Sequence, residues 1–312
     1  MRRPSPLPAL CLALAAALPG AARAELGFVT NQGANSVWEV DLATGEKLRE
    51  WSIPGAPAGV AVAPSGLVYV TSPENGRVTA INPKTAALTP IEVGGGPLGI
   101  AANPVTDEIY VADWYGGRLS VLRDGAVEGS VETGEGPSGI AVTPDGATIL
   151  TADRDSDQVS VIDAKTLTRL AVIPVGQHPF GVTIDAEGRR AYTADVYANQ
   201  VSVIDIAARK VVGTVKTDER PYKVALARGR GFVTNSYGSD LTVFDLASLE
   251  PLGEIEVGDY PEGIEATKDG GTLYVANWFD NTMSRIDPVA MKVTGEFETG
   301  DGPRSFGDFI HD

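Results

Sequence analysis

The sequence predicts an all-β fold made of seven copies of one unit, and three markers in register support this prediction. The first is a YVTN-like segment whose copies start 40 to 42 residues apart, at 28–31, 69–72, 110–113, 150–153, 192–195, 232–235 and 274–277. The second is a proline with the same period, usually within V/T-G-x-x-P-x-G-I/V-A, namely Pro57, Pro97, Pro137, Pro179, Pro221, Pro261 and Pro303. The third is VSVID, intact at 159–163 and 201–205 and changed to LTVFD at 241–245.

Each unit contains four short strand patterns. In the fourth copy these are GIAVTP, TILTAD, QVSVID and TRLAVIPV, with the apolar GIAVTP expected to be innermost. β-Branched residues dominate the strands, and Asn, Asp, Gly and Pro dominate the turns. Four strands in about 40 residues match one propeller blade. We therefore predict a seven-bladed β-propeller with four-stranded antiparallel blades.

The two ends of the chain predict how the ring closes. After residue 24 the chain begins directly at a second strand, LGFVTN, and it finishes on an extra first strand, PRSFGDFI (303–310). We expect this C-terminal strand to join the N-terminal blade and close the ring. Closure removes the open sheet edges that promote aggregation.

The N-terminal segment has the pattern of a secretory signal peptide. It carries two arginines near its start, an apolar run over 7–18 and the A-x-A sequence Ala-Arg-Ala at 22–24, so we predict cleavage after Ala24. The mature chain is then a single propeller domain, 25–312, in the periplasm or secreted. The apolar run is too short to span a bilayer, and no later segment resembles a membrane helix. We expect no membrane insertion.

Charge and cysteine content exclude several classes of function. The chain has 25 basic and 41 acidic residues, and three of the arginines lie in the leader, so the mature charge is (25 − 3) − 41 = −19. Nonspecific binding to nucleic acid or to anionic lipid needs a positive surface, so neither is expected. The one cysteine, Cys11, lies in the leader, which leaves no disulfide, thiolate nucleophile or cysteine metal site. We expect a monomer.

The YVTN, VGxxPxGIA and VSVID markers resemble those of the YVTN-family seven-bladed β-propeller repeat proteins. The resemblance covers essentially the whole mature chain. It implies an exported or surface protein of the bacterial and archaeal type. Related propellers include accessory factors of periplasmic quinone-dependent oxidation systems, haem d1-type propellers and methylamine dehydrogenase heavy chains. The resemblance therefore implies a role beside a periplasmic redox system.

The strand order predicts which loops share a face. The loop with the marker proline enters the first strand of a blade, and the YVTN-like segment ends the second strand. Adjacent antiparallel strands place these two loops at the same end. Both sets of loops should therefore open on one face around the central channel, where rigid scaffolds commonly present functional loops.

The residues beside the prolines change along the chain, which a repeat that only closes a ring does not require. Before proline stand Ala56, Gly96, Gly136, His178, Arg220, Tyr260 and Gly302. After proline stand Ala58, Leu98, Ser138, Phe180, Tyr222, Glu262 and Arg304. The loops after the YVTN-like segments add Trp114, Tyr115, Arg154, Asp155, Tyr197, Tyr237, Trp278 and Phe279. Small residues thus give way to aromatic and charged ones in the later copies.

We predict a ligand or partner site on this face, above the fifth, sixth, seventh and first blades. Its centre is His178, Arg220, Tyr222, Tyr260, Glu262 and Arg304, with Trp114, Tyr197, Tyr237 and Trp278 around it. Aromatic and arginine side chains are typical of binding surfaces. In the alternative, these side chains only plug the channel or pair with one another, as Arg220 with Glu262, and Tyr222 and Phe180 belong to the core.

Three carboxylates end second strands at Asp113, Asp153 and Asp195. Together they would suit a hard divalent cation. The matching positions in other blades are Asn or Ser, which cap turns by accepting from nearby amides, and this role accounts for all seven copies. We therefore predict no metal site and no cofactor, with a divalent cation as the alternative.

Three functions fit these residues. The first is a non-enzymatic propeller that binds a small ligand or a protein partner. The second is a metal-assisted lyase or lactonase-type hydrolase, with His178 as general base, Glu262 as metal ligand or acid and Arg220 as anion clamp. The third is an adhesion scaffold, which the lack of a linker or second domain disfavours. The absence of histidine clusters and of a G-x-S-x-G motif favours the first.

Overall fold

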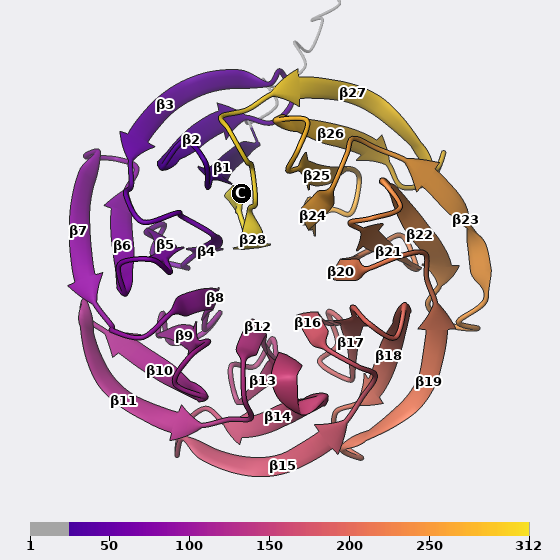
Figure 1. The fold of residues 1–312 in the computed structure, drawn as a ribbon, viewed down its shortest axis with the longest axis horizontal. Coiled ribbons are helices and arrows are strands. Elements are labelled where there is room, and N and C mark those ends of the chain that lie inside the picture. The colour runs from indigo at the N-terminus through magenta and orange to yellow at the C-terminus, as the bar shows by residue number, and fades with distance from the viewer. Residues whose placement is uncertain (1–24, 312) are drawn as a thin grey trace, which may run out of the picture.

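The computed structural model describes residues 25–311 and confirms the predicted fold. Seven sheets stand side by side in a ring around a central channel, and the consecutive strands of each blade lead outward from the channel to the rim (Figure 1). The predicted leader, 1–24, lies outside the described residues. Within residues 25–311, no helix has the length and apolar character needed to cross a membrane.

The strands of the first four blades, in chain order, are β1 (Leu26–Asn31), β2 (Ser36–Asp41), β3 (Glu46–Ser52); β4 (Gly59–Val62), β5 (Val68–Ser72), β6 (Arg77–Asn82), β7 (Ala87–Glu92); β8 (Pro97–Ala102), β9 (Ile109–Asp113), β10 (Arg118–Arg123), β11 (Ala126–Glu132); β12 (Pro137–Val142), β13 (Thr148–Asp153), β14 (Gln158–Asp163) and β15 (Thr168–Pro174). One 3-10 turn, η1 (Arg154–Ser156), follows β13.

The strands of the last three blades and the tail are β16 (Pro179–Ile184), β17 (Arg190–Asp195), β18 (Gln200–Asp205), β19 (Lys210–Lys216); β20 (Pro221–Ala227), β21 (Arg230–Asn235), β22 (Asp240–Asp245), β23 (Pro251–Glu256); β24 (Pro261–Ala266), β25 (Leu273–Asn277), β26 (Thr282–Asp287), β27 (Lys292–Glu298); β28 (Phe306–Asp308) and β29 (Ile310–His311). Within each blade, consecutive strands pair antiparallel.

The YVTN-like marker is a core element. Its strand is buried along its whole length in β5, β9 and β25. The aromatic residue that opens the marker is fully buried in Tyr110, Tyr192 and Tyr274. Burial of one such side chain stabilises the fold by roughly 1.5–3 kcal/mol. The marker therefore recurs because each blade must pack its faces against two neighbours.

The glycine of the proline marker lets neighbouring inner strands approach closely. A Cβ atom on Gly99 would lie 1.7 Å from the carbonyl oxygen of Ser138 in the next blade. A Cβ atom on Gly139 would lie 2.5 Å from the carbonyl oxygen of Phe180 in the blade after it. Backbone therefore packs on backbone around the channel, and a side chain at these positions would force the blades apart.

The C-terminal segment closes the ring, but it is not the single strand predicted over 303–310. Pro303 forms a bridge with Asn31, β28 then pairs in parallel with β4 of the second blade, and only β29 pairs with β1. The chain changes direction at Ser305, which has a positive φ of 45°. Figure 1 shows the resulting short β28 inside the channel. The first sheet has the order β29-β1-β2-β3.

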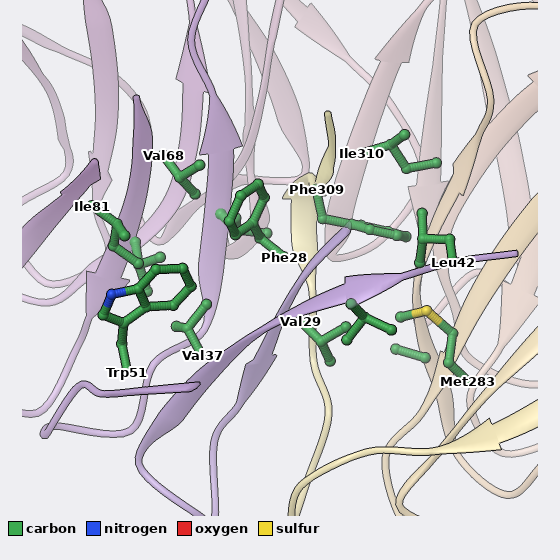
Figure 2. Close-up of a cluster of buried hydrophobic side chains, with 14 of the residues drawn as sticks. Phe28, Val29, Val37, Leu42, Trp51, Val68, Ile81, Met283, Phe309 and Ile310 are labelled. Carbon is green, nitrogen blue, oxygen red and sulfur yellow. The ribbon is translucent and has the colours of Figure 1, made fainter. Parts of the chain in front are cut away.

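A hydrophobic cluster fixes this closure. Phe309 is fully buried, and its carbonyl accepts a hydrogen bond of 2.8 Å from the amide of Phe28. Phe309 and Ile310 lie beside Leu42 and Met283 in the cluster between the first and last blades (Figure 2). The C-terminal residues thus supply core contacts as well as strand pairing.

Two polar side chains hold the tail from the channel side. Lys223 occupies the position where most blades have the marker glycine, and its ammonium donates to the carbonyl of Gly307. One carboxylate oxygen of Glu265 accepts from the amides of Phe309 and Ile310, at 2.5 and 2.9 Å. Burial and the nearby charge of Asp308 raise the pKa of Glu265 to about 8, although Lys223 opposes this shift.

Candidate functional site

The proline loop and the loop after the second strand are joined at the channel mouth in six of the seven blades, as predicted. The amide of Val196 donates to the carbonyl of His178 at 3.0 Å. In the sixth blade, the amide of Ser236 donates to the carbonyl of Arg220 at 2.9 Å. In the seventh blade, the amide of Trp278 donates to the carbonyl of Tyr260 at 3.0 Å. In these six blades the bond fixes the residue before the proline at the mouth, on the face that we call the Gly-Pro face.

A cavity of about 330 Å³ opens on the Gly-Pro face. Eight of the ten predicted site residues line it, and its full lining is Trp114, Arg154, Phe180, Val196, Tyr197, Arg220, Tyr222, Ser236, Tyr237, Tyr260, Glu262 and Arg304. We call this cavity the aromatic pocket. Its volume lies within the range of small-molecule sites in proteins.

The residues that follow the prolines form the floor of the aromatic pocket. Phe180 and Tyr222 are buried, with ring centroids 4.4 Å apart, and both pack on Phe306 of β28 at 5.0 and 5.5 Å. Ala58 and Leu98 complete this cluster. Phe180 and Tyr222 therefore belong to a core that closes the channel, as the alternative interpretation held, and they also face the pocket.

A buried ion pair lies at the base of the pocket. The Nε of Arg304 is 3.0 Å from a carboxylate oxygen of Glu262, and both side chains are largely enclosed. The guanidinium also donates to the Tyr222 hydroxyl, at 3.0 Å from Nε and 2.6 Å from Nη2. The suggested pairing of Arg220 with Glu262 is wrong, because Arg304 takes that carboxylate.

Burial affects the protonation states of Glu262 and Tyr222 at the bottom of the pocket. It raises the pKa of Glu262, although the Arg304 charge and a hydrogen bond with Tyr222 both act against the shift. Burial also raises the pKa of the Tyr222 hydroxyl well above its ordinary value, again opposed by Arg304. The tyrosine is therefore neutral at physiological pH, and the ion pair is the charged unit of the pocket floor.

Arg220 lies higher in the pocket, against aromatic rings. Its guanidinium carbon is 4.0 Å from the ring centroid of Tyr197 and 5.6 Å from that of Tyr237. No carboxylate within residues 25–311 lies within 4.0 Å of this guanidinium. By contrast, Arg154, which also lines the pocket, pairs with Asp155. Arg220 therefore offers a positive charge with open hydrogen-bond donors at the pocket wall.

Two predicted residues lie beside the pocket and do not line it. The His178 ring stacks on Tyr197 with centroids 4.2 Å apart, and its Nδ1 is 3.8 Å from Asp155. Trp278 packs on Tyr260 and donates from its indole nitrogen to the side chain of Gln32. No nitrogen of the His178 ring lies within 4.0 Å of a carboxylate oxygen of Glu262. The catalytic pairing of these two residues stays a prediction.

Three bulky residues adopt a backbone conformation that usually favours glycine. The φ angles are 55° at His178, 59° at Arg220 and 58° at Tyr260, whereas Gly136 and Gly302 occupy this position in two other blades. The left-handed region costs a non-glycine residue on the order of 1 kcal/mol. The same conformation recurs at Leu167, Arg209 and Leu249, in turns away from the pocket, so it is a feature of the turns of the repeat and does not by itself mark a binding site.

The three strand-ending aspartates cap turns of their own blades. The carboxylate of Asp195 accepts from Ser202, Gln200, Thr193 and the amide of Gly176. Asp153 has the same four kinds of partner in the preceding blade. Burial raises the pKa of both, although these hydrogen bonds oppose it. Across residues 25–311, no group of three or more His, Cys, Asp or Glu side chains is arranged to hold a metal ion.

The predicted site omits several residues that the structure places at the face or in the channel. Arg154, Phe180, Val196 and Ser236 line the pocket, and the first two stood in the aligned loops without being assigned to the site. Lys223 lies in the channel below the floor. Its signal was present, because it breaks the P-x-G pattern that Gly181 and Gly263 keep in the neighbouring blades.

Comparison with known proteins identifies the fold and no family. No protein-family model matches the chain, and no curated protein matches it, so membership of the YVTN family is not confirmed. Among solved structures, the chain is similar to hydrazine synthase of Kuenenia stuttgartiensis, with a TM-score of 0.71, 18% identity, and coverage of 81% of this chain and 89% of that one.

Two further structures share the fold. A dihydro-heme d1 dehydrogenase in complex with DHE has a TM-score of 0.69 and 17% identity, covering 90% of this chain and 66% of that one. A streptogramin B lyase has a TM-score of 0.70 and 16% identity, covering 81% of this chain and 90% of that one. At such identities the similarity establishes a β-propeller architecture and nothing about activity.

Proposed function

We propose that this protein is an exported, non-enzymatic propeller that binds a small ligand in the aromatic pocket. The observation that carries the proposal is the convergence of eight predicted residues, from four blades and the C-terminal segment, on one cavity of about 330 Å³. The pocket combines aromatic walls with a few charged groups, which is the usual composition of a ligand site. Export is proposed from the signal-peptide pattern of residues 1–24.

An accessory role in a periplasmic quinone- or redox-linked oxidation system is the finer form of this proposal. Two observations support it. The sequence markers resemble those of the YVTN family, and two proteins with the same fold are named as a hydrazine synthase and a dihydro-heme d1 dehydrogenase. The catalytic alternative needs His178 and Glu262 at one substrate atom. Since His178 packs against Tyr197 outside the pocket lining, we do not propose that reaction.

A thermal-shift screen of the mature chain tests the binding function. The panel holds divalent cations, quinone cofactors, haem and small carboxylates. A ligand that binds only the folded state stabilises it by about 2.7 kcal/mol at 100 times its Kd. We expect at least one compound to raise the Tm of the wild type and to have no effect on the Tyr197→Ala/Tyr237→Ala variant.

Tyr115→Ala is the matched control for this screen. Tyr115 stands at the same loop position as Tyr197 and Tyr237 in its own blade and is 81% exposed, but it does not line the pocket. The control should keep the full shift. Failure of every compound to shift the wild type, or an undiminished shift in the double variant, would contradict the proposal.

A further inference from the structure

We infer that the ligand of the aromatic pocket is a planar aromatic carboxylate, with its carboxylate on Arg220 and its ring against the tyrosine walls. This inference rests on the proposed function, because it names the chemical class of the ligand in the same pocket. Charge and ring geometry support it independently.

The first support is the charge inside the pocket. Three arginines and one glutamate line it, whereas the chain as a whole carries a net charge of −16. Glu262 neutralises Arg304, and Asp155 neutralises Arg154. Arg220 is left without a carboxylate within 4.0 Å among the described residues. An unpaired guanidinium in a concave site attracts an anion, and its fork of donors matches a carboxylate.

The second support is the placement of Arg220 against Tyr197 at 4.0 Å and Tyr237 at 5.6 Å. A guanidinium that rests on an aromatic ring keeps its N–H donors free at its edge for a bidentate contact. The Tyr237 ring is 61% exposed, so ring surface remains there for a ligand, whereas the Tyr197 ring is already contacted by both Arg220 and the His178 ring. A flat ring attached to the bound carboxylate would then stack on the pocket wall.

The volume of the pocket suits a ligand of modest size. The Tyr237 and Tyr260 rings lie 5.6 Å apart, and the Phe180 and Tyr222 rings close the floor. A cavity of roughly 150 Å³ is enough for benzene. The pocket volume of about 330 Å³ therefore accommodates two fused rings with a carboxylate.

Isothermal titration calorimetry with three matched probes tests the inference. The probes are 2-naphthoate, its uncharged counterpart 2-naphthamide, and trans-decalin-2-carboxylate, which keeps the charge without the flat ring. The mature wild type should bind 2-naphthoate most tightly. Arg220→Gln should weaken 2-naphthoate binding about 10- to 100-fold and leave 2-naphthamide binding within about 2-fold.

Arg169→Gln serves as the control variant, because Arg169 is exposed on the outer strand β15, and it should bind 2-naphthoate like the wild type. Equal affinity of 2-naphthoate and 2-naphthamide, equal affinity of the flat and saturated acids, or no 2-naphthoate binding would overturn the inference. These outcomes would reject the ligand class only, because the thermal-shift screen tests separately whether the pocket binds a ligand at all. A Tm shift that depends on Tyr197 and Tyr237 but comes from another compound retains the binding function and rejects only the ligand class.

Discussion

Loss of the Glu262 carboxylate should destabilise the protein strongly, because it leaves the buried Arg304 guanidinium without a negative charge beside it. In the pair, the Nε–Oε2 distance is 3.0 Å, which corresponds to an attraction of about 5.5 kcal/mol at an effective dielectric constant of about 20. The side chains are only 6% and 18% exposed, so water replaces little of this attraction. Removal of one partner of such a pair costs about 3–5 kcal/mol. For Glu262→Gln we expect a loss of about 3 kcal/mol in the free energy of unfolding, at the low end of this range. The loss is limited because Arg304 retains its hydrogen bonds to the Tyr222 hydroxyl.

Arg304→Met should cost less than Glu262→Gln. The glutamate left behind can take up a proton, and burial already raises its pKa, whereas arginine cannot lose its charge. The double variant should recover much of the loss, with a coupling energy of about 1–3 kcal/mol. Urea unfolding of the four proteins measures this cycle.

The exposed pair Arg77–Glu92 provides the control, because Glu92→Gln should change stability by less than about 0.5 kcal/mol. Two results would refute a stabilising role of the buried ion pair. One is a cycle in which the losses from Glu262→Gln and Arg304→Met are purely additive, and the other is a loss of stability in Glu262→Gln no larger than that in Glu92→Gln.

Three further predictions concern the backbone and the tail. Gly139→Ala should lower stability by roughly 1–3 kcal/mol in urea unfolding, since its Cβ would meet the Phe180 carbonyl at 2.5 Å; an unchanged midpoint would contradict this packing. His178→Gly should be more stable than His178→Ala by about 0.5–1 kcal/mol, because only glycine relieves the left-handed φ of 55°, and equal stabilities would argue against strain. The folded state holds the Glu265 proton more tightly than the unfolded chain. Its contribution to stability is therefore present below its ordinary pKa of 4.5 and is lost as pH rises through about 8. The Tm of the wild type relative to Glu265→Gln should fall from about pH 5 to about pH 9, and a flat difference would reject the shift.

The fold was predictable because its causes are local and repeated. Burial of Tyr110, Tyr192 and Tyr274 and the contact of Gly99 with Ser138 recur in blade after blade, so they leave markers at a fixed period. The path of the tail was not predictable in the same way. Residues 303–310 carry the pattern of a first strand, and pairing of β28 with β4 depends on the turn at Ser305 and on the contacts of the channel.

The candidate site was predictable as a set of positions but not as a set of contacts. Alignment of the prolines selected the residues that converge, because every blade presents equivalent positions at the same height. Which group each charged side chain pairs with depends on how deep in the pocket that side chain lies. Glu262 and Arg304 both follow a proline in adjacent blades and meet at the floor, whereas Arg220 precedes one and lies above them on Tyr197. Sequence alone gives no measure of this offset.

A crystal structure of the mature protein with 2-naphthoate tests the central claim most directly. We predict the ligand in the aromatic pocket, with its carboxylate about 2.7–2.9 Å from the Arg220 guanidinium and its rings against Tyr237. An empty pocket at saturating 2-naphthoate, or a ligand bound only elsewhere on the propeller, would contradict it.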